Sequence, residues 1–135
     1  MVQASGFIGK TAQFDSAVSG LSADRPAQWS YKASAPIDQL TATITDATGH
    51  QVMSGPIAAT QSGDFSWNGT MANGEKAPPG VYTLALKGMT TTGSTVPTAI
   101  TTSGRVDEVL GSGGTVSLGV NGAQIAMSRL IKLAS

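Results

Sequence analysis

The 135-residue chain contains no cysteine, which excludes disulfides, thiolate nucleophiles and thiolate metal sites. It has no apolar run approaching the ~20 residues that cross a bilayer, and no basic segment followed by an apolar one near its start. The sequence therefore predicts neither membrane insertion nor a cleavable signal. A fold without disulfides has to be stabilised by packing alone.

Charge is also scarce, at 12% of residues, and eight basic residues balance eight acidic ones. The basic residues are scattered, whereas nucleic-acid and anionic-membrane surfaces depend on clustered Lys and Arg. We therefore expect no nucleic-acid partner. Aromatic residues make up only 5%, so burial has to rest mainly on aliphatic side chains and on Met.

Catalytic and metal-binding patterns are missing as well. The single histidine, His50, follows the turn sequence Asp46-Ala47-Thr48-Gly49 and has no signalled partner, so we interpret it as an exposed turn residue. Asp107 and Glu108 are adjacent, and in a strand they would point to opposite faces. Gly111–Gly114 lacks the Lys-Ser/Thr ending of a phosphate loop and is better explained as a hairpin turn. We expect a protein that is not an enzyme and binds no cofactor.

Two weaker patterns, one for calcium and one for sugar, are present in the sequence. Asp64, Asn68 and Asn73 offer oxygens for calcium, but they lack the spacing of a calcium loop and also form turns. Four aromatic residues are candidates for a sugar-binding platform, although so small an aromatic content is needed first in the core; they are Trp29, Tyr31, Trp67 and Tyr82. No metal site is predicted.

What the chain does contain is strand and turn patterning. In residues 37–45, Leu40, Ala42 and Ile44 fall on one face and threonines on the other, which is typical of a half-buried strand. A turn at residues 46–49 leads to a return strand. A Thr-rich turn at residues 88–93 is expected to join strands 81–87 and 94–100. Together with the segments around Trp29, Trp67 and Tyr82, this makes about seven predicted strands between residues 27 and 100. That number and spacing indicate an immunoglobulin-like or fibronectin type III sandwich.

The two ends of the chain have a different sequence pattern. Residues 104–133 predict short strands joined by glycine turns, and a meander of this kind is marginal alone. Residues 6–14 predict one further strand that can complete it. We therefore expect a discontinuous domain of residues 1–22 and 100–135 with the sandwich, residues 23–99, inserted into it, and a crossing near Ser22.

In this order of segments the chain resembles the C-terminal part of bacterial flagellar hook-capping, or hook assembly scaffolding, proteins. The resemblance covers nearly the whole chain and rests on these pieces: Phe7-Ile8-Gly9-Lys10-Thr11, Ile44–Gly49 with Val52, Phe65-Ser66-Trp67-Asn68-Gly69, Pro79-Gly80-Val81-Tyr82-Thr83, Gly104–Val109 and Ile125–Leu133. It implies an all-β fold in which a fibronectin type III-like sandwich is inserted into a Tudor-like small β-barrel. The residues expected to carry this structure are Trp67, Asn68, Gly69, Gly80, Tyr82, Ile8, Gly9, Val106 and Val109.

The resemblance also implies a function. Proteins of this kind form a cap at the distal end of the nascent hook and promote the ordered addition of hook subunits. The implied partners are hook subunits and further copies of the full-length protein in a cap ring. The implied location is reached by flagellar type III export, for which the family uses an additional N-terminal region. The alternative is a secreted adhesive or carbohydrate-binding sandwich module.

Overall fold

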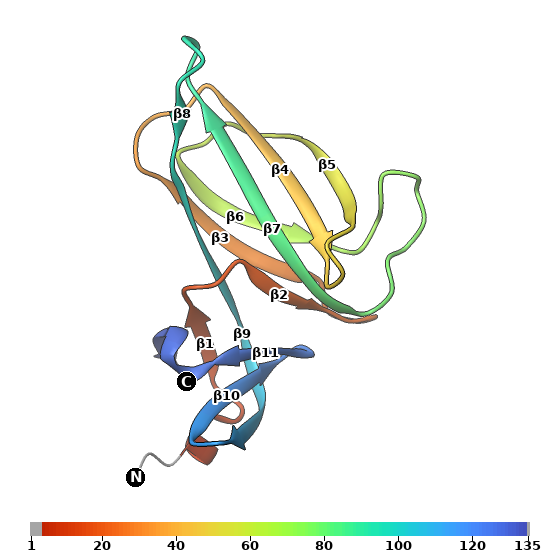
Figure 1. Cartoon of the computed structure of the whole chain (residues 1–135), viewed down its shortest axis with the longest axis vertical. Coiled ribbons are helices and arrows are strands. Elements are labelled where there is room, and N and C mark those ends of the chain that lie inside the picture. Colours follow the sequence, from red (N-terminus) through yellow and green to blue (C-terminus); the bar gives the residue numbers. More distant parts are fainter. Residues whose placement is uncertain (1–3, 135) are drawn as a thin grey trace.

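The computed structural model describes residues 4–134, and it consists almost entirely of β-strands in two lobes stacked along the long axis (Figure 1). The strands are β1 (Thr11–Phe14), β2 (Val18–Leu21), β3 (Ala27–Ala33), β4 (Gln39–Asp46), β5 (Gln51–Ile57), β6 (Ser62–Trp67), β7 (Gly80–Met89), β8 (Thr95–Val96), β9 (Thr98–Ser112), β10 (Thr115–Val120), β11 (Ala123–Ala126) and β12 (Leu130–Ala134). Two short 3-10 helices, η1 (Ala4–Phe7) and η2 (Met127–Arg129), complete the described chain.

The larger lobe, which we call the sandwich lobe, contains β2 to β8 and the first part of β9. One sheet has the order β2-β7-β4-β5, with β8 also paired to β7, and β3 pairs with both β6 and β9 in the facing layer. The predicted alternation in β4 is confirmed, because Leu40, Ala42 and Ile44 are all buried. Between the layers, Trp29 stacks near Phe65 with ring centroids 6.1 Å apart.

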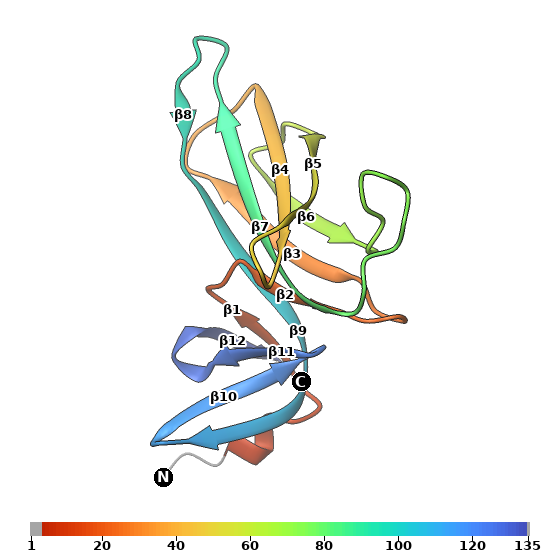
Figure 2. The same cartoon turned by 45° about the vertical axis from the view of Figure 1, so that its right-hand side comes forward.

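The smaller lobe, which we call the terminal lobe, has the strand order β11-β10-β9-β1-β12. Its core is built from Phe14, Val106, Leu118, Val120 and Ile125, together with two buried alanines. β1 lies between β9 and β12 and pairs antiparallel with both. The expected pairing between the two ends of the chain is therefore present for Thr11–Phe14, and Figure 2 shows β1 and β12 in the same lobe. The Tudor-like character of this lobe stays a prediction.

A single strand, β9, runs through both lobes (Figures 1 and 2). Its residues 98–102 pair with β3, residues 102–105 with β1, and residues 106–112 with β10. The sequence had suggested two separate segments on either side of residues 101–103. Because backbone hydrogen bonding continues through this region, the lobes share a structural element as well as being joined by linkers.

Two predicted strands differ from those observed. The strand expected over residues 6–14 begins only at Thr11, because residues 4–7 form η1 and Gly9 has a φ of 88°, which turns the chain. The strand expected over residues 94–100 was to pair with residues 81–87. Of these residues, only Thr95 and Val96, which form β8, pair with β7, at Met89 and Gly88. From Thr98 the chain lies in the other layer beside β3. Pro97, which lacks an N–H donor, stands at this change of layer.

The first crossing between the lobes precedes Ser22. β2 pairs with β7 over residues 18–21, so these residues belong to the sandwich sheet. The crossing segment is anchored at both ends. The N–H of Asp15 donates to the carbonyl of Arg129 in the terminal lobe (2.8 Å), and the carbonyl of Ala17 accepts from the Trp29 indole in the sandwich core (2.7 Å). A division of the chain into two domains, with its bounds, remains our proposal.

Candidate functional site at the lobe junction

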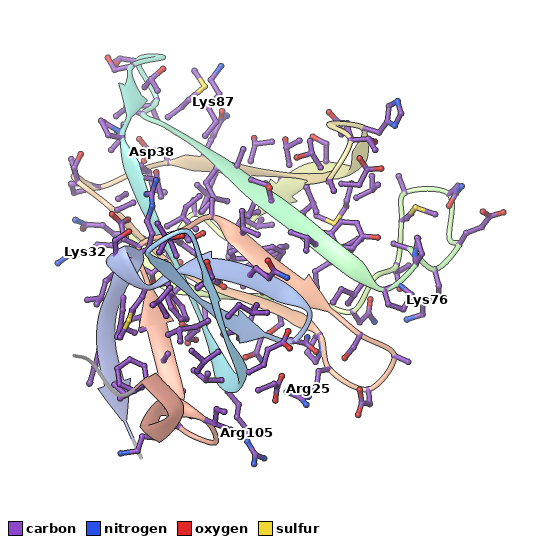
Figure 3. The ribbon with its side chains drawn as sticks, turned by 60° about the horizontal axis from the view of Figure 1, so that its bottom comes forward. Arg25, Lys32, Asp38, Lys76, Lys87 and Arg105 are labelled. Carbon is purple, nitrogen blue, oxygen red and sulfur yellow. The ribbon has the colours of Figure 1, made fainter. Side chains whose placement is uncertain are left out.

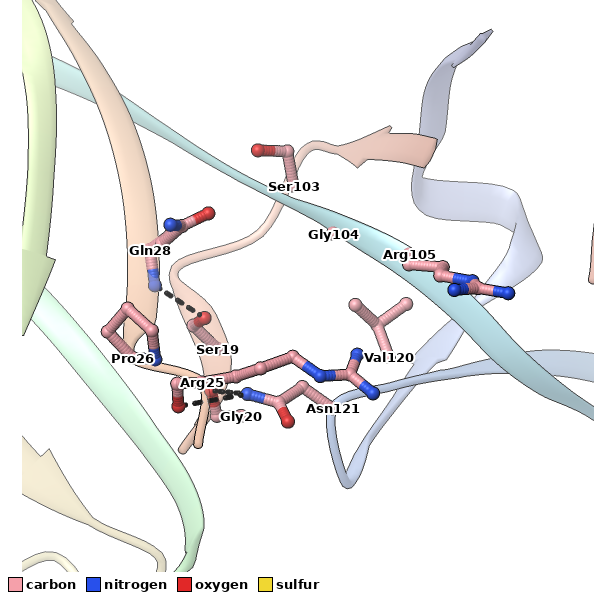
Figure 4. A pocket seen from close by; sticks show the side chains of 10 residues that line it. All are labelled: Ser19, Gly20, Arg25, Pro26, Gln28, Ser103, Gly104, Arg105, Val120 and Asn121. Carbon is pink, nitrogen blue, oxygen red and sulfur yellow. Dashed lines mark hydrogen bonds between the residues drawn. The ribbon is translucent and has the colours of Figure 1, made fainter. Parts of the chain in front are cut away.

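The lobes meet where the turn between β10 and β11 contacts β2 and the loop of residues 22–26. Asn121 heads this turn, and its side-chain Nδ2 donates to the carbonyls of Gly20 (2.8 Å) and Arg25 (3.5 Å), as Figure 4 shows. Its φ of 51° lies in the left-handed region that asparagine tolerates better than most residues, and Gly122 follows with a φ of 91°. The Asn-Gly turn therefore closes the β10–β11 hairpin and also connects the terminal lobe to the sandwich lobe by hydrogen bonds.

Gly20 allows the lobes to approach this closely, because a Cβ there would overlap the backbone carbonyl of Asn121. Within the terminal lobe, a Cβ on Gly104 would lie 2.5 Å from Cγ1 of Val120, so β9 and β10 also pack tightly beside the junction. Neither glycine has a positive φ, so close packing and not backbone conformation requires glycine there. The junction is completed by Val18 and Val81 of the sandwich lobe, which pack on the core of the terminal lobe.

An ion pair crosses the same junction. The Arg25 guanidinium lies 3.5 Å from Oδ2 of Asp107, and that oxygen also accepts the Asn121 N–H at 3.2 Å. The Arg25 and Asp107 side chains are 47% and 40% exposed, so solvent screens the pair and it contributes little stability alone. The sequence indicated only that Asp107 and Glu108 point to opposite faces of a strand; in the structure Asp107 connects β9, the Asn121 turn and the sandwich loop.

Beside these contacts a cleft of about 370 Å³, open to solvent, lies between the lobes (Figure 4). Both lobes contribute to its lining, which consists of Ser19, Gly20, Arg25, Pro26, Gln28, Ser103, Gly104, Arg105, Val120 and Asn121. Arg25 and Arg105 project from the same side of the molecule, whereas Lys87 lies at its opposite end (Figure 3). The cleft is therefore locally basic in a chain whose overall charge is zero.

The predicted structural residues of the sandwich lobe gather at one end of it. Trp67 and Tyr82 form an edge-to-face pair with centroids 4.9 Å apart, and both are buried. The Tyr82 hydroxyl donates to the carbonyl of Pro78 four residues upstream (2.6 Å), which is the arrangement of a tyrosine corner. Asn68 accepts from the N–H and hydroxyl of Thr70, and Gly69, with a φ of 96°, packs against Leu21.

The remaining predicted residues have unequal surroundings. Val106 is fully buried in the terminal core and Val109 packs against it half-buried. Gly9 donates its N–H to the carbonyl of Val106 (2.9 Å), which joins the N-terminal turn to β9. Ile8, in contrast, is 51% exposed in that turn, and an added Cβ on Gly80 would touch nothing. The structure assigns no packing role to these last two positions.

The aromatic side chains considered for sugar binding are all in the core. Trp29, Tyr31, Trp67 and Tyr82 are between 1% and 7% exposed. A sugar platform needs an exposed ring face, and none of these four rings provides one. The structure therefore gives the carbohydrate-binding alternative no support.

His50 is exposed, as expected. Its Nδ1 lies 2.9 Å from the Thr48 hydroxyl, which donates to Asp46 at 2.6 Å, so all three side chains belong to one turn. The Thr48 hydroxyl is the main reason that the pKa of Asp46 lies below its usual range, and the His50 and Thr48 amides add to the effect. This cluster faces solvent and caps the β4–β5 hairpin.

The oxygens considered for calcium are engaged separately. Asp64 accepts from Ser30 across β6 and β3, and Asn68 and Asn73 each accept within their own turns. Among the residues that the structure describes, no three acidic or histidine side chains gather to hold a metal ion. No helix within residues 4–134 is both long and apolar enough to cross a membrane.

Sequence reasoning missed the residues of the junction, above all Gly20, Arg25 and Asn121. Asn121-Gly122 was identified as a turn, because that dipeptide favours positive φ. Nothing local to it indicates that its side chain reaches a residue 101 positions away. Gly20 carries no signal either, because its requirement for glycine comes from the other lobe.

Comparison with known proteins agrees with this architecture. Residues 16–93 match the family model described as FlgD Ig-like domain. The crystal structure of FlgD from Xanthomonas campestris, described in terms of hook capping essential for flagellar assembly, is 26% identical, with a TM-score of 0.74 over 96% of this chain and 95% of that one.

Two further structures share the fold at lower identity. FlgD from P. aeruginosa is 21% identical, with a TM-score of 0.73 over 95% of this chain and 98% of that one. Truncated FlgD from Helicobacter pylori is 19% identical, with a TM-score of 0.56 over 96% and 95%. A comparison with curated protein sequences gives no significant match.

Proposed function

Because the chain belongs to the FlgD family of flagellar hook-capping proteins, we propose that it acts as a non-enzymatic scaffold at the distal end of the growing hook, where it promotes the ordered addition of hook subunits. The observation that carries this proposal is the combined match of the family model over residues 16–93 and of a FlgD structure over nearly the whole chain. Hook subunits are its partners, and in the full-length protein further copies assemble with it into a cap ring.

The architecture supports a mechanical role. A cap has to keep its shape while subunits insert beneath it, and here four features hold the lobes together: continuous β9, the anchored crossing at residues 15–17, the Asn121 turn and the apolar contact of Val18 and Val81. A neutral surface of Ser, Thr and Gly favours weak, reversible contacts over a permanent interface. The protein reaches this position through flagellar type III export.

The test is to locate the protein and to remove it. An epitope-tagged full-length protein is expected at the tips of nascent hooks by immunogold electron microscopy. Cells lacking the gene are expected to export hook subunits that fail to assemble, and the untagged gene should restore hooks. Hooks of normal number and length in the deletion strain would refute the scaffold function. Labelling spread over the cell surface would instead favour a secreted adhesive module.

A further inference from the structure

We propose that the cleft between the lobes binds a carboxylate side chain on an acidic, extended segment of a partner protein. This goes beyond the scaffold function, which does not require any particular binding site. It rests on hydrogen-bond donors from both lobes that line the cleft, and on the shape of the surface beside it.

The donors in the cleft are largely unused. The Arg105 side chain has no hydrogen-bond or ion-pair partner among the described residues, and the Arg25 side chain makes one ion pair, at 3.5 Å, although a guanidinium carries five N–H donors. The side chains of Gln28 and Ser103 have no partner within residues 4–134 either. The Ser19 hydroxyl accepts the Gln28 N–H at 3.1 Å, which leaves its own hydrogen available. An anion placed here would find donors on β2, β3 and β9.

The local charge selects the kind of anion. Arg25 and Arg105 contribute two positive charges, and Asp107, beside Arg25, removes one. A net charge near +1 suits a carboxylate better than a phosphate dianion, whose second charge would be repelled by Asp107. Guanidinium groups also match the two oxygens of a carboxylate in a bidentate arrangement.

The surroundings favour a peptide over a small free acid. The cleft is open to solvent, and a second hollow of about 270 Å³ shares Gln28 and Ser103 with it. This hollow continues along the outer face of β3 and β6 past Ser30, Asp64 and Ser66. Ser30 and Ser66 are small and polar, whereas the Asp64 carboxylate would repel a second acidic residue on this path. An extended chain can therefore lie along it with a single acidic residue, in the cleft.

The test is an NMR titration of the uniformly ¹⁵N-labelled chain with the peptide acetyl-Ala-Glu-Ala-Ala-amide. Saturable shifts are expected at the amides of Ser19, Gln28 and Ser103, with a dissociation constant on the order of 1 mM. Arg105→Gln should weaken binding about tenfold, as expected for loss of one charge-assisted contact. Because the Arg105 side chain is exposed and makes no hydrogen bond or ion pair with the described residues, while its backbone pairing with Thr11 is retained, this variant should keep the structure intact. Lys87→Gln, which changes charge equally but lies at the far end, should leave the affinity unchanged.

Four results would overturn the proposal. The first is that the cleft amides do not shift, and the second is that the neutral peptide acetyl-Ala-Gln-Ala-Ala-amide shifts them equally. The third is that Lys87→Gln weakens binding as much as Arg105→Gln. The fourth is that inorganic phosphate shifts the same amides at lower concentration than the acidic peptide. The titration involves no hook component. Its failure would therefore leave the scaffold proposal standing, and failure of the localisation experiment would leave the titration result standing.

Discussion

Replacing Gly20 by alanine is the sharpest perturbation of the lobe junction. The new methyl group would overlap the backbone carbonyl of Asn121, and no side-chain rotation can relieve an overlap with backbone atoms. The lobes therefore have to separate, or β2 has to shift from β7. Overpacking of this kind costs about 1–3 kcal/mol, and loss of the Asn121–Gly20 hydrogen bond costs about 1 kcal/mol more. For a chain of this size the sum lowers the Tm by about 10 °C.

The matched control is Gly80→Ala. Gly80 pairs with Leu21 in the same β2–β7 ladder, has no positive φ, and an added Cβ there meets nothing within 4 Å. Its substitution should change stability by no more than about 0.5 kcal/mol. Thermal unfolding followed by far-UV circular dichroism measures both variants. If Gly20→Ala melts within about 2 °C of Gly80→Ala, the close approach of the lobes is not tight and the reasoning is refuted.

Four further predictions concern the same architecture. Asn121→Gly retains a residue suited to positive φ but loses the contacts to Gly20 and Arg25, so urea unfolding should show a loss of about 1 kcal/mol; an unchanged midpoint would mean that these contacts contribute nothing. Tyr82→Phe removes the hydroxyl bond to Pro78 and should also cost about 1 kcal/mol in urea unfolding, unless water replaces it without loss. Burial, aided by the charge of Asp46, raises the pKa of Tyr82, so the folded protein keeps the hydroxyl proton to higher pH than the unfolded chain does. The free energy of unfolding should therefore fall as pH rises from about 10 through the raised pKa. Urea titrations at several pH values should show this fall in the parent protein and a flatter dependence in Tyr82→Phe. Deleting residues 1–14 removes β1 from between β9 and β12, so amide hydrogen exchange should accelerate in the terminal lobe and not in β4 and β7; the reverse pattern would contradict the pairing.

Local patterns were enough to predict much of the sandwich lobe. The alternation of Leu40, Ala42 and Ile44 with threonines requires a half-buried strand, and the turn at residues 46–49 forms the expected hairpin. The glycine turn after β9 is also present, with Gly113 and Gly114 at positive φ. These features depend on side-chain period and turn chemistry, which are written into short stretches of sequence.

Apart from its glycine turns, the terminal lobe was predictable only as a pairing of the chain ends. That β9 continues without a break through Gly104 depends on β1 and β10 supplying hydrogen bonds to it, and these partners are distant in sequence. Of residues 94–100, Thr95 and Val96 pair with β7 as predicted, but residues 98–100 pair with β3 in the other layer, because their apolar content suits either layer. The cleft, with Ser19, Arg25 and Arg105, exists only after both lobes have docked.

The central claim is that the two lobes form one rigid scaffold held by β9 and the junction. Residual dipolar couplings measured for backbone amides in both lobes of the aligned protein test it most directly. The structure predicts that couplings from β4 and β7 and couplings from β1 and β10 fit a single alignment tensor. Two tensors of clearly different magnitude or orientation would show that the lobes move independently, and the claim would be wrong.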